Sequence, residues 1–129
     1  MPRLRAGGKW VFGWAMVGAQ REITLPPEAC LEYQLLPGAE VAFTMGSRTS
    51  GGFGIGRCAN IRGNPPISRR ILATGKMGDG GRIYLPPEVG LEPRARLLMV
   101  RGSGIALGLL RRGPLYERAK GHSEIKVFG

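Results

Sequence analysis

The sequence is poor in the residues from which metal sites and catalytic pairs are built. Its 129 residues include one histidine, one aspartate and two cysteines. Cys30 and Cys58 form no Cys-x-x-Cys pair and lie far along the chain from His122, so a zinc site is not expected. Asp79 stands in a glycine turn, and no residue pattern supports acid–base or nucleophilic catalysis. We therefore expect no enzyme, no metal and no cofactor.

Long apolar runs are also missing. None approaches the length that spans a bilayer, and residues 1–5 lack the apolar core of a cleaved leader. We expect a cytoplasmic protein with reduced thiols and no membrane partner. The 22 glycines and 10 prolines favour many short strands and tight turns, which excludes an all-helical bundle.

Acidic residues are few compared with basic residues. There are 9 of them against 19 Lys and Arg, which gives a net charge of +10. Clustered cations gain free energy by displacing counterions from phosphates, so this balance indicates a polyanionic partner. Residues 1–64 carry 7 basic and 4 acidic groups and residues 65–129 carry 12 and 5, so the second half should dominate such a contact.

What the sequence does contain is a repeat with an offset of 60 residues. Residues 18–28 read GAQREITLPPE and residues 78–88 read GDGGRIYLPPE, with six of eleven positions identical. After a gap of four residues the register continues, with residues 36–41 over residues 92–97. Two copies of one unit, each too small to enclose a core alone, should pack against one another.

Each copy is expected to contain two strands, a short helix and two more strands. Alternating apolar residues predict the strands, and each Pro-Pro-Glu predicts a helix start, because proline suits the first helical turn and glutamate its positive end. In the second copy the helix is little more than a turn. The predicted strands are 10–17, 23–25, 41–45 and 53–58, then 71–77, 83–85, 97–99 and 105–110; the predicted helices are 27–35 and 87–91.

This arrangement resembles the swapped-hairpin domain of AbrB, SpoVT and MazE-type transcription regulators and antitoxins. Its most specific segment is residues 81–89, GRIYLPPEV, which is similar to the family's Gly-Arg-hydrophobic-x-hydrophobic-Pro-x-Glu core. In that family, units from two chains interleave their hairpins in a small barrel-like dimer. The resemblance covers about residues 9–57 and 70–111. It implies a mostly β, β-rich α+β fold, in which tandem units of one chain form an intramolecular pseudo-dimeric barrel.

We expect both units to form one domain, in a chain that is a monomeric pseudo-dimer or a higher homo-oligomer. The linker between the units is turn-rich and has no periodic apolar face. The tail ends in an alternating, strand-like segment that could join the chain's own sheet, a neighbouring subunit or a protein partner. The predicted organisation is an N-terminal extension (1–8), a first unit (9–57), a linker (58–70), a second unit (71–111) and a C-terminal tail (112–129).

The resembled family binds DNA through basic residues on the first strand, at the turn before the second strand and after the Pro-x-Glu. In the second copy the resemblance assigns the first two roles to Lys76 and Arg82. The first copy has Met16 and Glu22 at these places, with Arg21 one residue away.

At the helix position, where the family commonly has arginine, the chain has Gly90 and Cys30. The second copy adds Arg94 and Arg96, which the first copy lacks. Each arginine also has a structural interpretation as a solvated surface group. The candidate nucleic-acid-binding residues are Lys76, Arg82, Arg94, Arg96 and Arg21.

Two further features leave alternatives open. The pairs at residues 69–70 and 111–112 flank the second copy and could contact phosphate or serve solubility. Trp10, Phe12 and Trp14 alternate along one predicted strand, and three aromatics on one strand face are more typical of core or partner packing than of base stacking.

The sequence therefore predicts a protein that binds double-stranded DNA, as a transcription regulator or a DNA-organising protein. The alternative is a structural scaffold or an antitoxin-like partner-binding module without specific DNA binding, whose positive charge meets an acidic protein or RNA.

Overall fold

Short strands dominate the fold. The computed structural model describes residues 10–102 and 104–129, and the predicted extension at residues 1–8 lies outside them. The β-rich α+β class is confirmed. The elements are β1 (Val11–Met16), β2 (Glu22–Thr24), α1 (Pro27–Tyr33), β3 (Glu40–Met45), β4 (Phe53–Arg57), α2 (Cys58–Arg62), α3 (Pro65–Ser68), β5 (Ile71–Lys76), η1 (Asp79–Gly81), β6 (Arg82–Tyr84), η2 (Pro87–Val89), β7 (Arg96–Arg101), β8 (Leu107–Leu110), α4 (Pro114–Ala119) and β9 (Val127–Phe128).

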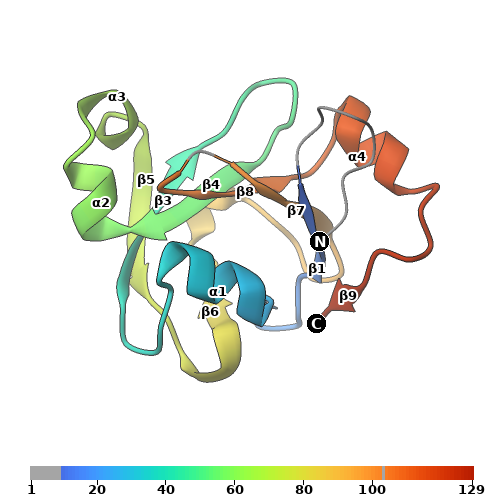
Figure 1. Cartoon of the computed structure of the whole chain (residues 1–129), viewed down its shortest axis with the longest axis horizontal. Helices are drawn as coiled ribbons and strands as arrows, with labels where there is room; N and C mark the ends of the chain where they lie inside the picture. The colour runs from blue at the N-terminus through green and yellow to red at the C-terminus, as the bar shows by residue number, and fades with distance from the viewer. Residues whose placement is uncertain (1–9, 103) are drawn as a thin grey trace.

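The two copies of the repeat exchange strands. Seven strands form one sheet in the order β5-β3-β4-β8-β7-β1-β9, and β2 pairs with β6 in a separate two-stranded ribbon (Figure 1). The first strand of each copy pairs with the third strand of the other copy, β1 with β7 and β5 with β3. Neither half of the chain therefore holds a complete sheet by itself.

The two exchanged pairings have the same register. Met16 lies opposite Arg96 between β1 and β7, and Lys76 lies opposite Glu40 at the equivalent place between β5 and β3. An approximate twofold axis thus relates the repeats within one chain. Equivalent residues meet at this axis: Ile23 with Ile83 in the ribbon, and Ile55 with Leu107 between β4 and β8.

The expectation of a barrel needs correction. Within the described residues the large sheet stays open, with β5 at one edge and β9 at the other. The ribbon of β2 and β6 lies apart from this sheet and buries one face against the core through Ile23 and Ile83. Each fully buried aliphatic side chain of this kind contributes about 1.5–3 kcal/mol. The largest fully buried side chains are Phe43, Ile23, Leu25, Leu35, Ile55, Ile61, Ile83, Leu97, Leu98, Met99, Leu107 and Leu109.

The aromatic residues of β1 do not share one face, contrary to the simple alternation. The pairing with β7 shifts by one residue between Val11 and Gly13, so Phe12 is the extra residue of a β-bulge. Phe12 enters the main core, whereas Trp14 packs in a second cluster with Leu98 and residues around α4. Both rings are packing residues, since Phe12 is 8% and Trp14 4% exposed.

The linker is helical rather than an irregular connection. Residues 58–70 contain α2 and α3, and α3 starts with a proline in its first turn. Cys58 and Ile61 of α2 are buried against β3 and β4, so the segment covers one end of the sheet. The turn-forming composition of the linker gave no indication that Cys58 and Ile61 are buried, because their burial depends on packing against β3 and β4.

The C-terminal tail folds onto the chain's own sheet. It forms α4 and then β9, which pairs in parallel with β1 through Val127 and Phe128. Ile125 is 7% exposed and joins the cluster around Trp14. Of the alternatives for the tail, addition of an edge strand to its own sheet is therefore observed. The division into two units and their boundaries stays a prediction.

Candidate nucleic-acid interface

The ribbon of β2 and β6 presents a polar outer face. Because strand side chains alternate, the residues on either side of buried Ile23 and Ile83 point outward. Thr24 pairs with Arg82, which is exposed, and Tyr84 is 56% exposed. The outer row of this ribbon face consists of Glu22, Thr24, Arg82 and Tyr84.

Two of the candidate residues lie at one end of the ribbon. Lys76 ends β5, and Arg82 follows only after the tight turn in which the Gly78 amide donates to the Arg82 carbonyl at 2.8 Å. Both side chains are exposed, and neither forms an ion pair with a described residue. Acidic residues are close in the chain or the sheet, since Glu40 is the cross-strand neighbour of Lys76 and Asp79 stands in the turn.

The other three candidates lie at the opposite end. The Arg94 amide donates to the Val17 carbonyl at 2.7 Å, which joins its loop to the segment that carries Arg21. Arg21 forms an ion pair with Glu92 at 3.5 Å, with side chains 51% and 79% exposed, so the pair contributes little to stability. Arg96 lies over the ring of Trp14, 4.8 Å from its centroid.

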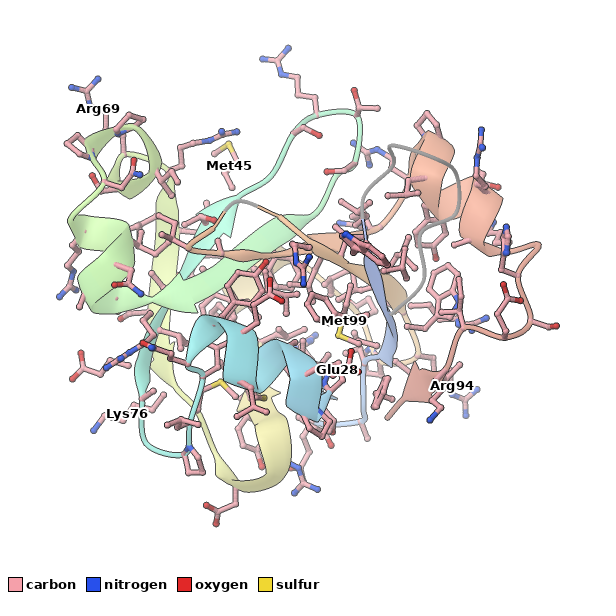
Figure 2. The ribbon with its side chains drawn as sticks, viewed as in Figure 1. Glu28, Met45, Arg69, Lys76, Arg94 and Met99 are labelled. Atoms are coloured by element: carbon pink, nitrogen blue, oxygen red, sulfur yellow. The ribbon has the colours of Figure 1, made fainter. Side chains whose placement is uncertain are left out.

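The candidates therefore form two groups rather than one. Figure 2 shows Lys76 and Arg94 projecting from opposite ends of the lower side of the molecule, on either side of the segment that contains the ribbon. The twofold arrangement of the repeats explains this separation, because Lys76 and Arg96 occupy the two equivalent exchanged pairings.

Arg21 and Arg94 have unusual backbone conformations. Their φ angles are 59° and 72°, in the left-handed region that costs a non-glycine residue about 1–2 kcal/mol. The equivalent residues of the other copy are Gly81 and Gly38, with φ angles of 79° and 83°. The fold thus requires this conformation at both places, and each copy fills one of them with arginine.

The departures from the family pattern have local structural explanations. Glu22 Oε1 accepts a hydrogen bond from the Gln20 amide at 3.0 Å, which ties the carboxylate to its own turn. Gly90 ends η2 with a φ of 62°, a position that favours glycine. Cys30 is half-buried against the core, and burial raises the pKa of its thiol. None of the three side chains is a cation that could pair with phosphate.

A second basic region is assembled from residues that the candidate set omitted. The pairs at 69–70 and 111–112 are 41 residues apart in sequence, from Arg70 to Arg111, yet both meet the β3–β4 hairpin loop, residues 46–52. Arg48 of that loop was not singled out by any motif. A sequence signal exists: between Glu40 and Asp79 there are six basic residues and no acidic one, namely Arg48, Arg57, Arg62, Arg69, Arg70 and Lys76.

No protein-family model matches this chain, and neither a curated protein nor a solved structure shows significant similarity to it. The described residues include no helix that is both long enough and apolar enough to cross a membrane.

Proposed function

We propose that this chain binds double-stranded DNA through the outer face of the β2–β6 ribbon and the basic residues at its two ends. The supporting observation is the ribbon itself, with exposed Arg82 and Tyr84 on its face and unpaired Lys76 and Arg94 at opposite ends. The major groove of B-form DNA admits a two-stranded β-ribbon, and flanking cations would contact phosphates. A role in regulating transcription or organising DNA, as in the resembled AbrB-like family, is part of this proposal.

The left-handed arginines support the same function. A strained backbone position that glycine would fill without cost persists when the side chain is useful. Arg94 makes no side-chain hydrogen bond or ion pair with a described residue, so its contribution inside the fold does not repay the strain. A contact between the Arg94 side chain and a phosphate would offset the strain.

The test is fluorescence anisotropy of a labelled random-sequence duplex of about 25 base pairs at three salt concentrations. The logarithm of the binding constant should fall with the logarithm of salt with a slope of about −0.9 per phosphate contacted. Lys76→Glu with Arg82→Glu should weaken binding by about tenfold or more, because two cations are replaced by repulsive charges.

The matched control is Arg62→Glu with Arg118→Glu, which changes the net charge equally at exposed positions away from the ribbon. If both double variants bind alike, the ribbon is not the interface.

The alternative, a scaffold for an acidic protein or RNA, is favoured by one observation. Carboxylates stand among the cations of the ribbon face, with Glu22 on the face and Glu92 paired to Arg21. Absence of duplex binding by the wild-type protein at low salt would support this alternative.

A further inference from the structure

The β3–β4 hairpin loop is held in place by arginines from two distant segments. Nη2 of Arg70 donates to the Gly46 carbonyl at 3.4 Å, and Nη2 of Arg112 donates to the Arg48 carbonyl at 3.0 Å. The backbone amides of Arg111 and Arg112 both donate to the Ser50 carbonyl at 3.0 Å. The loop is thereby fixed to the ends of β5 and β8.

Close packing limits the freedom of this loop further. At Gly51, with a φ of 61°, a Cβ atom would lie 2.6 Å from Cζ of Arg112, so the guanidinium lies directly against the glycine backbone. The Ser47 hydroxyl accepts from the Ser50 amide at 3.1 Å. A contact surface on this loop would be preorganised, which lowers the entropy cost of binding.

The charges around the loop are of one sign. Five exposed arginines, defined here as the arginine loop surface, come from the loop and from the two pairs beside it. None of them forms an ion pair with a described residue, whereas Arg101 binds Glu32 through two hydrogen bonds of 2.7 and 2.6 Å and Lys120 pairs with Glu117. The five residues are Arg48, Arg69, Arg70, Arg111 and Arg112.

The segments that carry these arginines contain no acidic residue. The acid-free stretch between Glu40 and Asp79 supplies three of its arginines, and a second acid-free stretch between Glu92 and Glu117 supplies the other two. Five arginines without ion-pair partners, one on the fixed loop and four beside it, would repel one another, so the arrangement fits an anionic partner.

This surface and the ribbon lie on opposite sides of the molecule. In Figure 1 the loop between β3 and β4 rises at the top, whereas β6 lies at the bottom. Figure 2 shows Arg69 and Met45 on the upper side and Lys76 on the lower side. One straight duplex on the ribbon would leave the arginine loop surface uncovered.

We propose that the arginine loop surface binds the phosphate backbone of a second DNA duplex, so that one chain bridges two duplexes. This proposal rests on the proposed function for the first duplex. Arginine side chains contact phosphates in protein–DNA complexes, and this surface offers five of them, all exposed. Phosphate contacts of this kind bind without reading sequence.

A two-duplex capture experiment tests the bridging. One 25-base-pair duplex, of about the length used above, is fixed to beads, and protein and a fluorescent duplex of different sequence are added at low salt. The wild-type protein should retain the fluorescent duplex on the beads. Arg48→Glu with Arg111→Glu should reduce the retained fluorescence by about fivefold or more relative to Arg62→Glu with Arg118→Glu, because two phosphate contacts are lost.

The mutated side chains make no hydrogen bond in the described structure, so the fold should persist, which circular dichroism checks. Arg48→Glu with Arg111→Glu should still bind a single duplex, through the ribbon. If the wild-type protein binds one duplex but retains no second one, bridging is wrong and the ribbon proposal stands. If Arg48→Glu with Arg111→Glu loses the single duplex while Lys76→Glu with Arg82→Glu keeps it, the ribbon proposal is wrong, and bridging falls with it.

Discussion

The non-glycine residues with left-handed backbone follow a simple rule in the described part of this chain. Arg21, Gln34 and Arg94 have φ angles of 59°, 56° and 72°; Arg21 and Arg94 are equivalent to glycines in the other copy, and Gln34 ends α1 in the conformation with which Gly90 ends η2. Gln34 has a structural partner, since its Oε1 accepts from Nη1 of Arg57 at 3.1 Å. Arg94 has no such partner among the described residues, and the proposed function assigns its side chain to DNA contact.

Replacing both strained arginines by the glycines of the other copy separates binding from folding. Arg21→Gly with Arg94→Gly should leave the free energy of unfolding within about 1 kcal/mol of wild type, because relief of strain offsets the greater freedom of the unfolded chain. Duplex binding should weaken by about threefold or more, with a shallower salt slope. Urea unfolding and anisotropy measure the two effects. A variant that binds like wild type would remove both arginines from the interface.

The loop of the arginine surface depends on a glycine that no side chain can replace. A Cβ atom at Gly52 would come within van der Waals overlap of the Leu109 carbonyl, so Gly52→Ala should destabilise the protein by about 1–3 kcal/mol. Gly104→Ala is the control, since a Cβ there meets nothing within 4 Å, and its stability should change by less than about 0.5 kcal/mol. Thermal unfolding of the two variants gives the comparison.

Tyr33 makes stability depend on pH in the alkaline range. Burial, with a smaller contribution from the Glu32 carboxylate, raises the pKa of Tyr33 to about 12 from 10.0. The folded state therefore holds the Tyr33 proton more tightly than the unfolded state does. The resulting contribution to the free energy of unfolding is complete below pH 10 and is lost between pH 10 and about 12.

The measurement is urea unfolding of wild type and Tyr33→Phe at pH 9 and pH 11.5. Wild type should lose about 1–2 kcal/mol more than Tyr33→Phe between these values. Equal losses would mean that Tyr33 ionises alike in the folded and unfolded states.

At the scale of elements, the local sequence pattern predicted several strands. It did not predict features that depend on contacts between segments distant in the chain. The strands around residues 41–45 and 71–77 were predicted within one residue at each end, although β3 buries four consecutive residues and β5 buries none. The bulge at Phe12 was not predicted from the sequence, because the position of the extra residue depends on how β1 pairs with β7. In the linker, Cys58 and Ile61 are the buried positions of a five-residue helix, which is too short to show a period.

Only part of the candidate site could be predicted from the sequence. Lys76 and Arg82 were assigned from the resemblance to the AbrB-like family, and both are exposed. The meeting of Arg70 and Arg112 at one loop could not be read from the sequence, because strand exchange brings together segments whose separation in the chain gives no periodic signal.

The tail should stabilise the edge of the large sheet. Deleting residues 123–129 removes β9 and Ile125, which exposes Trp14 and should lower the free energy of unfolding by about 2 kcal/mol or more. In a Trp10→Phe background the fluorescence of Trp14 should shift to longer wavelength. Unchanged emission and stability would mean that the tail packs only weakly on β1.

At the scale of the whole molecule, strand exchange makes the two halves interdependent. Residues 1–64 contain β1 and β3, whose partners β7 and β5 lie in the other half. The isolated segment 1–64 should therefore be unfolded or should dimerise, and mixing it with residues 65–129 should restore the native circular dichroism spectrum. Size-exclusion chromatography with light scattering distinguishes these states. A stable monomer of residues 1–64 would contradict the observed pairing.

Because the two related halves share one chain, their surfaces need not be the same. Met16 and Glu22 stand where the other half has Lys76 and Arg82, so the two ends of the ribbon carry different groups. A homodimer with identical halves is matched to a palindromic target, since operator symmetry mirrors protein symmetry. The ribbon of this chain instead has two different ends. Any duplex that it contacts through the ribbon would be bound in one preferred direction.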